Sequence, residues 1–404
     1  MSRAAQFRVA VRKFAPFESA IRRQWEAFEE VEKSGLALDA VALDLHPLTE
    51  ALFTNQGLVR GDWDVAFLVT DWLPAVQQQR AVADVSSLLR TQPPEGFPDA
   101  WPPSLLRQHE IDGEVLGLPY HDGPECLIYR RDLLEDPAEQ AAYQARYGAP
   151  LRVPETWTEF RQVARHFHRP ERGLYGTIFA AYPDGHNTVY DFCLQLWTRG
   201  GELMDPAGRL QLATPQAAAA LEFLRSMIND SASVHPSCRE FDSVKSGLAF
   251  AAGEAALMVN WFGFASMAET VADSRVKGRV GIAPVPHAEG CQGTSLNIYW
   301  ILAIAAGSPH AEVAWRFLRH AASPAMDKLL TLEGGIGCRR STWLDPDVNR
   351  VIPFYREMET LHAHARELPR TPDWPRIAET IDRMVLAAID THRPVEEILR
   401  EAVA

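Results

Sequence analysis

The sequence predicts an α/β protein of two lobes, each a mostly parallel sheet flanked by helices. At 404 residues the chain is too long for one ordinary hydrophobic core, so we expect two. Strand and helix patterns alternate up to residue 69, and this βαβαβ order is typical of a parallel sheet. Two uncharged apolar runs, residues 255–259 and 280–285, are typical of strands buried on both faces.

The first lobe opens with a Val- and Ala-rich alternating run, residues 7–13, which predicts the first strand. Helical spacing follows over residues 18–33. We then expect a strand at 38–45, a short helix at 48–57 and a strand at 63–69. Because such sheets bind ligands at the carboxyl ends of their strands, the Thr70-Asp71-Trp72 run at such an end is a candidate contact.

Helical spacing recurs through the rest of the chain. Thr156 can cap a helix that Glu159 supports three residues later, as in a capping box. Another helix ends at Gly200-Gly201, the residue type typical of a helix C-terminus. The other expected elements are helices at 187–199, 214–227, 310–321 and 374–403, and strands at 175–179 and 297–306.

The composition limits the function classes. Hydrophobic residues make up 47% of the chain and charged residues 23%, as in soluble globular proteins. The formal net charge of −13 argues against a nucleic-acid partner, since nucleic-acid binding draws on clustered Lys and Arg. The same charge leaves a cationic ligand open. No run approaches eighteen uncharged apolar residues, so we expect no membrane span.

The most informative stretch is residues 246–286, where a helix and a buried strand lead to Asn260-Trp261 and a second strand ends at Pro286. It resembles the sugar-type solute-binding proteins of bacterial ABC importers, of the maltose-binding-protein kind. In that family "F-x-x-G-x-A-A-M" leads to an Asn-Trp pair, followed by "K-G-x-V-G-x-A-P-x-P". Residues 111–119 and 154–160 resemble the family's "G-K-x-Y-G-L-P" and "P-x-T-W-x-E-F", and the resemblance extends from residue 7 to about residue 345.

This resemblance implies the type II periplasmic-binding-protein fold, with a hinge of three segments near Pro119, residues 299–303 and residues 323–330. Residues 1–118 plus 300–325 would form the N-terminal lobe. Residues 119–299 plus 326–404 would form the C-terminal lobe, with the ligand cleft between the two. The implied function is to bind a small carbohydrate or polyol and deliver it to an ABC transporter permease, as a monomer without cofactor, metal or nucleic acid.

The candidate ligand-binding residues follow strand ends, crossings and family positions. They are Lys13, Phe14, Phe17, Asp71, Trp72, His121, Asp122, Asn187, Asp191, Asn260, Trp261, Asn297, Tyr299, Trp300 and Arg339. A carboxylate or amide can hold sugar hydroxyls while an indole covers the C–H face of the ring. His121 and Asp122 follow the Pro119 crossing, in a run that continues Gly-Pro-Glu125. We expect one of Tyr299 and Trp300 to face the ligand.

Each of the main candidates also has a structural interpretation. Asp71 is placed to cap the helix that begins near Leu73. Trp261 can pack under the strand end as a core residue, and Arg339 can pair with a surface Asp. A His-Asp pair also occurs in metal phosphohydrolases, although further ligands at set distances are missing here.

Two alternatives to sugar binding stay open at this point. A polyamine or other cationic solute suits the acidic balance of the chain. A carbohydrate-active enzyme is the less favoured alternative, because the sequence contains no G-x-S-x-G, H-E-x-x-H or kinase motif, and therefore no catalytic residue is assigned.

The N-terminal residues and the cysteines bear on location. Residues 1–7 lead straight into the first expected strand without an apolar signal region or a lipobox cysteine. The family resemblance favours an exported, periplasmic or extracellular protein whose leader is missing from this chain; a cytoplasmic relative is the alternative. Five scattered cysteines without a C-x-x-C pair favour buried free thiols over a disulfide framework.

Overall fold

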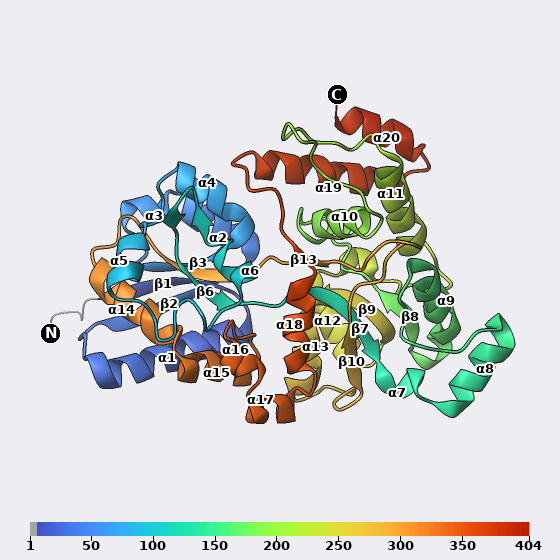
Figure 1. Ribbon diagram of the computed structural model, residues 1–404, viewed down its shortest axis with the longest axis horizontal. Helices are drawn as coiled ribbons and strands as arrows, with labels where there is room; N and C mark the ends of the chain where they lie inside the picture. Colours follow the sequence, from blue (N-terminus) through green and yellow to red (C-terminus); the bar gives the residue numbers. More distant parts are fainter. Residues whose placement is uncertain (1–5, 404) are drawn as a thin grey trace. The chain divides into compact units, whose positions relative to one another are not determined.

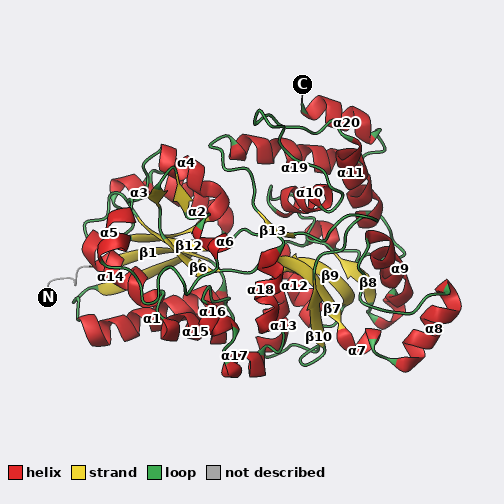
Figure 2. Cartoon of the chain, viewed as in Figure 1, coloured by secondary structure: helices red, strands yellow, loops and turns green. Residues whose placement is uncertain are grey.

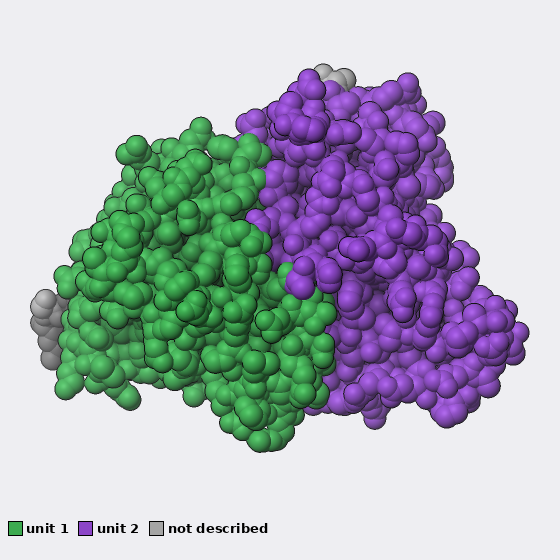
Figure 3. Space-filling model, in the orientation of Figure 1, with its two compact units in different colours: residues 1–123, 298–362, 370–372 green, residues 124–297, 363–369, 373–404 purple. Residues whose placement is uncertain are grey.

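The computed structural model describes residues 6–403 and divides them into two compact units (Figure 1, Figure 3). Within that range the first unit comprises residues 6–123, 298–362 and 370–372. The second comprises residues 124–297, 363–369 and 373–403. The chain passes between the units at 123/124, at 297/298 and again between 362 and 373. The first two passages lie within a few residues of the predicted crossings near Pro119 and residues 299–303.

The third passage differs from the sequence prediction, which placed it at 323–330 and assigned 326–404 to the second lobe. Helix α15 (Pro324–Leu332) packs against α1 (Ala15–Glu32) of the first unit. The Gln24 side-chain amide donates to the Met326 carbonyl over 3.1 Å. Residues 326–362 therefore belong with the first unit.

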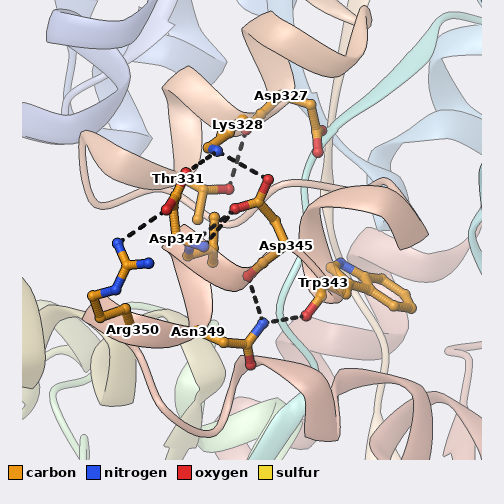
Figure 4. A network of polar contacts seen from close by, with 9 residues as sticks. Asp327, Lys328, Thr331, Trp343, Asp345, Asp347, Asn349 and Arg350 are labelled. Atoms are coloured by element: carbon orange, nitrogen blue, oxygen red, sulfur yellow. Dashed lines mark hydrogen bonds and ion pairs between the residues drawn. The ribbon is translucent and has the colours of Figure 1, made fainter.

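A polar network fastens the helices that follow α15 to that helix (Figure 4). Lys328 forms ion pairs with Asp345 and Asp347, each with an N···O distance of 2.9 Å. The Asn349 amide donates to the carbonyls of Trp343 and Asp345. Asp345 also caps α17 (Pro346–Val351) by accepting from two backbone N–H groups of its first turn. These contacts hold residues 343–349 against α15. They join residues up to 19 positions apart, farther than the three- and four-residue spacing within one helix.

The first unit contains a five-stranded sheet in the order β2-β1-β3-β12-β6 (Figure 2). Its strands are β1 (Gln6–Arg12), β2 (Ala37–Leu43), β3 (Val65–Val69), β6 (Leu118–His121) and β12 (Trp300–Ile304). β1 pairs in parallel with β2 and β3, whereas β12 runs antiparallel to both β3 and β6. Four strands therefore share one direction, and only β12, which follows the passage at 297/298, runs against them.

Helices cover this sheet, and short elements connect its strands. The helices are α1, α2 (Leu45–Thr49), α3 (Gly57–Arg60), α4 (Leu73–Gln78), α5 (Ser86–Thr91), α6 (Pro103–Leu106), α14 (Ala311–Ala321), α15, α16 (Arg340–Trp343), α17 and α18 (Met358–Ala363). β4 (Glu110–Ile111) and β5 (Glu114–Val115) form a hairpin. Phe7 stacks on Trp25 at 4.5 Å between ring centroids, and Phe317 of α14 meets both rings. The core of this unit thus lies between the sheet and α1 with α14.

The second unit contains a four-stranded sheet in the order β10-β7-β9-β8. Its strands are β7 (Glu125–Arg130), β8 (Tyr175–Ile178), β9 (Ala255–Trp261) and β10 (Val280–Ala283). β9 runs parallel to β8, whereas β7 runs antiparallel to both β9 and β10. Again one strand is reversed, and β7 is the strand that follows the passage at 123/124. Most strands of each sheet share one direction, but the reversed strand lies inside the sheet, so both sheets are mixed instead of mostly parallel as predicted.

The second unit is richer in long helices. They are α7 (Arg131–Leu134), α8 (Pro137–Tyr147), α9 (Trp157–Phe167), α10 (Asn187–Trp197), α11 (Pro215–Ile228), α12 (Ser243–Ala251), α13 (Phe262–Thr270), α19 (Trp374–Asp390) and α20 (Val395–Ala402). Two short strands, β11 (Ser295–Leu296) and β13 (Ala365–Arg366), pair in parallel. The predicted capping box is present at the start of α9, where Thr156 and Glu159 exchange side-chain-to-backbone hydrogen bonds.

Candidate functional site

In the first unit, the carboxyl ends of β1, β3 and β6 and the start of β12 lie at one edge of the sheet. Trp300, the first residue of β12, stands in register with Val69 at the end of β3 and with His121 at the end of β6. Its ring centroid lies 6.0 Å from that of Trp72 and 6.3 Å from that of Phe17. The sheet topology therefore brings predicted site residues from three separate parts of the chain together.

This strand-end cluster presents aromatic surface at the level of the strand ends. Trp72, Trp300, Phe14 and His121 are half-buried, whereas Phe17 is 2% exposed and lies beneath them. The Phe17 ring meets His121 at 4.6 Å and Phe14 at 5.1 Å, both nearly edge to face. Partly exposed indoles over a buried aromatic layer offer a flat apolar contact for the C–H face of a ligand.

His121 adds one polar group to this aromatic edge. The backbone N–H of Ile336 donates to its Nδ1 over 2.9 Å, so Nε2 carries the proton in the neutral ring. Burial lowers the pKa of His121 to about 3, because enclosure disfavours the charged imidazolium. At neutral pH the ring therefore offers an uncharged N–H donor, which suits a hydroxyl oxygen.

We expect His121→Gln to reduce the acid sensitivity of the protein. The His121 pKa is depressed in the folded state, so its contribution to stability is complete above pH 6.5 and is lost as pH falls towards 3. The effect is at most about 1.4 kcal/mol per pH unit for one proton. Melting temperatures between pH 7 and pH 4.5 should fall less in the variant than in the wild type; an equal fall would contradict this assignment.

Asp71 and Lys13 lie at the same edge, on neighbouring strand ends. Asp71 is half-buried in the turn that joins β3 to α4. The N-cap position of α4 is occupied by Trp72, so the capping role considered for Asp71 does not match the helix start. Lys13 is exposed and bonds Asp44 over 3.1 Å, and this hydrogen bond lowers the pKa of the Asp44 carboxyl.

Asp122 points into the interior of the first unit. Its carboxylate accepts from His362 Nε2 over 2.6 Å, and His362 Nδ1 meets the Ser104 hydroxyl at 3.0 Å. Asp122 is 2% exposed, and the His362 ring stacks on Trp343. These hydrogen bonds link Asp122 to His362. Each of the two residues lies close to a point where the chain leaves the first unit. The Asp122 carboxylate therefore has a structural role inside the first unit.

Two other candidates, Tyr299 and Arg339, are also used internally. Tyr299 is fully buried, and its hydroxyl donates to the Leu105 carbonyl. The Arg339 guanidinium donates to the carbonyls of Ala322 and Glu95 and covers the Trp101 ring at 4.5 Å. Of the adjacent pair Tyr299 and Trp300, the latter is therefore the one at the strand-end edge. Arg339 does not pair with a surface Asp.

In the second unit, the ends of β8 and β9 and the start of β7 lie at one edge of the sheet. Trp261, the last residue of β9, is half-buried, and its ring meets that of Tyr190 on α10 at 5.7 Å. Asp191, next on the same helix, is also half-buried, whereas Asn187 at the helix start is 7% exposed. The structure thus brings Trp261 beside α10, the helix that carries the candidates Asn187 and Asp191.

The amides of Asn260 and Asn297 are buried. Asn260 donates to the Ser243 carbonyl and the Ser246 hydroxyl of α12, and its oxygen accepts from the Trp261 backbone N–H. Its side chain therefore fastens α12 to β9. Asn297 is 1% exposed, and its backbone N–H donates to the Arg366 carbonyl beside the short β11–β13 pair.

Glu125 was not singled out by the sequence, yet it stands at the same edge of the second sheet as Trp261. It is the first residue of β7 and is paired directly with Trp261 of β9. Only its position three residues after Asp122, just past the passage at 123/124, pointed to it in the sequence. Phe53, whose ring meets Trp72 at 5.5 Å, was likewise missed.

The described residues contain neither a cluster of metal-ligating side chains nor a helix that could cross a membrane. Within residues 6–403, no group of three or more His, Cys, Asp or Glu side chains is arranged to hold a metal ion. Over the same range no helix has the length and apolarity needed to cross a membrane. All five cysteines are free thiols, four of them buried, as the sequence predicted.

Comparisons with known proteins agree with this architecture. The family model for the bacterial extracellular solute-binding protein matches residues 48–328. A probable ABC transporter-binding protein of Deinococcus radiodurans is 24% identical over 80% of this chain and 73% of its own length. The maltose-bound structure of T. maritima MalE3 superimposes with a TM-score of 0.86 at 21% identity, covering 99% of this chain and 98% of that one. A solute-binding protein of Agrobacterium radiobacter K84 in complex with ribitol gives 0.86 at 22% identity, covering 99% and 97%.

Proposed function

The chain belongs to the bacterial extracellular solute-binding protein family, and from this premise we propose that it binds a small carbohydrate or polyol and delivers it to the permease of an ABC transporter. The proposal includes a periplasmic or extracellular location, a monomeric state and no catalytic activity of its own. The structures bound to maltose and to ribitol support a hydroxylated ligand.

The observation that carries this proposal is the pairing of half-buried indoles with uncharged polar groups at strand ends. Trp72 and Trp300 lie beside the neutral His121 in the first unit, and Trp261 lies at the equivalent kind of edge in the second. A sugar or polyol has apolar C–H surface and hydroxyls on the same molecule. Aromatic rings contact the former, and the neutral imidazole N–H donates to the latter.

The affinity required is within reach of such a surface. A micromolar dissociation constant corresponds to about −8 kcal/mol. Aromatic side chains bury about 150–250 Å² each, and transfer of apolar area is worth about 25 cal/mol per Å². Two indoles, such as Trp72 and Trp300, with several hydrogen bonds therefore supply enough gross interaction energy to offset the cost of immobilising the ligand.

We expect at least one neutral carbohydrate or polyol to raise the melting temperature of the protein. The screen uses maltose, glucose, galactose, ribitol, sorbitol and mannitol, with putrescine and spermidine as cationic comparisons. A ligand at one hundred times its dissociation constant adds about 2.7 kcal/mol of stability. Stabilisation by the polyamines alone, or steady conversion of a bound sugar to product, would overturn the proposal.

A further inference from the structure

Glu125 is an enclosed carboxyl group without a partner for one of its oxygens. The residue is 3% exposed, and its Oε2 atom has no hydrogen-bond partner among the described residues. No lysine or arginine of residues 6–403 forms an ion pair with it, and the Ser295 hydroxyl donates to its backbone carbonyl, not to its carboxyl group. Burying an unpaired carboxylate costs several kcal/mol, so this group needs either a proton or a cation.

The strand pairing fixes the direction in which Glu125 points. Residues directly opposite in an antiparallel pair have side chains on the same face, and Glu125 stands opposite Trp261. The Trp261 ring meets Tyr190, so this face of the sheet is the one covered by α10. The next pair, Cys126 with Asn260, faces the other way, because the Asn260 amide bonds to α12. Glu125 therefore points towards the helix that carries Asp191.

The electrostatics of this face are acidic. Burial raises the pKa of Glu125 well above its usual value, and the nearby Asp191 raises it further. Burial raises the pKa of Asp191 to about 8, with a smaller contribution from Asp184. Two carboxyl groups, one enclosed and one half-buried, thus lie near each other, and neither forms an ion pair with a Lys, Arg or His side chain of residues 6–403.

The other titratable groups around the pair are three buried thiols, a histidine and an arginine that pairs elsewhere. Burial raises the pKa of the Cys126 thiol on β7 and of the Cys193 thiol on α10, and the nearby Glu125 carboxyl raises both pKa values further. The pKa of the Cys238 thiol is also raised, by burial and to a smaller extent by Asp191. His186 lies in the loop before α10, where its ring meets Tyr190. The positive charge of Arg366 partly lowers the pKa of Cys193, but the Arg366 guanidinium forms its ion pair with Glu202.

We propose that Glu125 and Asp191, with the ring of Trp261, form a subsite for a protonated amino group on the carbohydrate or polyol ligand. The ammonium would bond to the accessible Asp191, with the enclosed Glu125 behind it and the indole face beside it. A cation over an indole gains about 0.5–2 kcal/mol in addition to the ion pair. This inference rests on the proposed function and names the ligand class more closely.

Binding of such a ligand is linked to proton release. In the unliganded protein Asp191, whose pKa is raised to about 8, holds a proton at neutral pH; when the ammonium binds, its carboxyl O–H bond ionises, the proton passes to the buffer, and the amine keeps its own proton. Because deprotonation of the site accompanies binding, affinity for the amine should rise from pH 6 to pH 8. A neutral alcohol of the same shape would release no proton.

The test compares matched probes in which one hydroxyl is replaced by an ammonium. D-Glucamine is compared with D-sorbitol, and D-glucosamine with D-glucose, by titration calorimetry at pH 6, 7 and 8 in two buffers of different ionisation enthalpy. D-Glucamine, whose amine stays protonated at pH 8, should bind at least tenfold more tightly than D-sorbitol at that pH and release up to one proton; D-glucosamine, whose amine loses its proton near pH 8, is compared with D-glucose at pH 7 and below. Glu125→Gln and Asp191→Asn should each reduce that advantage to less than threefold, whereas Glu222→Gln on α11 should keep it.

The outcomes separate this inference from the proposed function. Neutral probes or screened sugars that bind, with no gain for the amine and no proton release, would overturn the subsite and leave the function intact. An amine advantage that survives in both variants would also overturn it. Should a variant fail to fold, the proton count of the wild type across the three pH values decides alone. Failure of every carbohydrate and polyol, amine or alcohol, would remove the function and the subsite together.

Discussion

Trp261→Ala is expected to weaken ligand binding by about 2 kcal/mol or more, roughly thirtyfold in the dissociation constant. The indole is half-buried at the end of β9 and has Tyr190 as its ring neighbour, so the remaining surface is available to a ligand. The unliganded protein should lose less than about 1.5 kcal/mol of stability, since the truncated ring is not enclosed. Calorimetric titration with the best ligand of the screen and urea unfolding measure the two effects.

Trp157→Ala provides the matched control within the same unit. This indole is 4% exposed, packs on Phe160 and Phe223, and donates to the Thr198 hydroxyl over 3.0 Å. Its truncation should cost about 3–5 kcal/mol of stability and should change affinity little in the fraction that stays folded. If Trp261→Ala lost as much stability as the control and kept its affinity, Trp261 would be a core residue instead of a ligand contact.

Asp327→Ala is expected to cost about 3–5 kcal/mol of unfolding free energy and to weaken ligand binding as well. Asp327 is 4% exposed, and its two carboxylate oxygens accept the backbone N–H groups of Cys338 and Arg339. Each buried N–H left without an acceptor costs about 1–3 kcal/mol. The same loop carries Ile336, whose N–H fixes the His121 ring, so a loosened loop also disturbs the strand-end cluster.

Asp347→Ala is the control for this prediction, because the Asp347 carboxylate pairs with Lys328, the residue next to Asp327 on α15 (Figure 4). The Asp347 side chain is 56% exposed and pairs with Lys328 and Arg350. Exposed ion pairs contribute less than about 1 kcal/mol, and salt screens them. Urea unfolding of both variants should therefore separate them by several kcal/mol. Equal losses would mean that the charge network, and not the two buried amides, holds the loop.

Local patterns were sufficient for the regular elements. Strand β1 and helix α1 begin within three residues of their predicted starts, and the Thr156–Glu159 capping box forms as expected. These features depend on neighbours a few positions apart, which a single sequence displays. The third passage between the units was misplaced, because it depends on contacts such as that of Gln24 with Met326, about 300 positions apart and without a local signal.

The candidate site was predicted at the level of segments but not of single side chains. Trp72 and His121 lie at the carboxyl ends of β3 and β6, which share one direction, and these ends meet at one edge of the sheet. Trp300 reaches the same edge because it opens β12, which runs antiparallel to both strands. Whether a given residue faces that edge or the interior follows from an alternation with period two. A shift of one position exchanges the faces, so Tyr299 and Trp300 were equal candidates until the sheet register was known.

The sequence by itself determined a two-unit α/β protein of this family with aromatic residues at its strand ends, because periodicity and motif spacing are local properties of the chain. Only the tertiary structure decided that Arg339, Asn260 and Asp122 are held by internal partners. It also decided that Glu125 stands opposite Trp261 with one carboxyl oxygen that has no hydrogen-bond partner in the described part of the chain. The physical reason is that burial and pairing depend on atoms brought close by folding, and these set both the direction of a side chain and the charge it can carry.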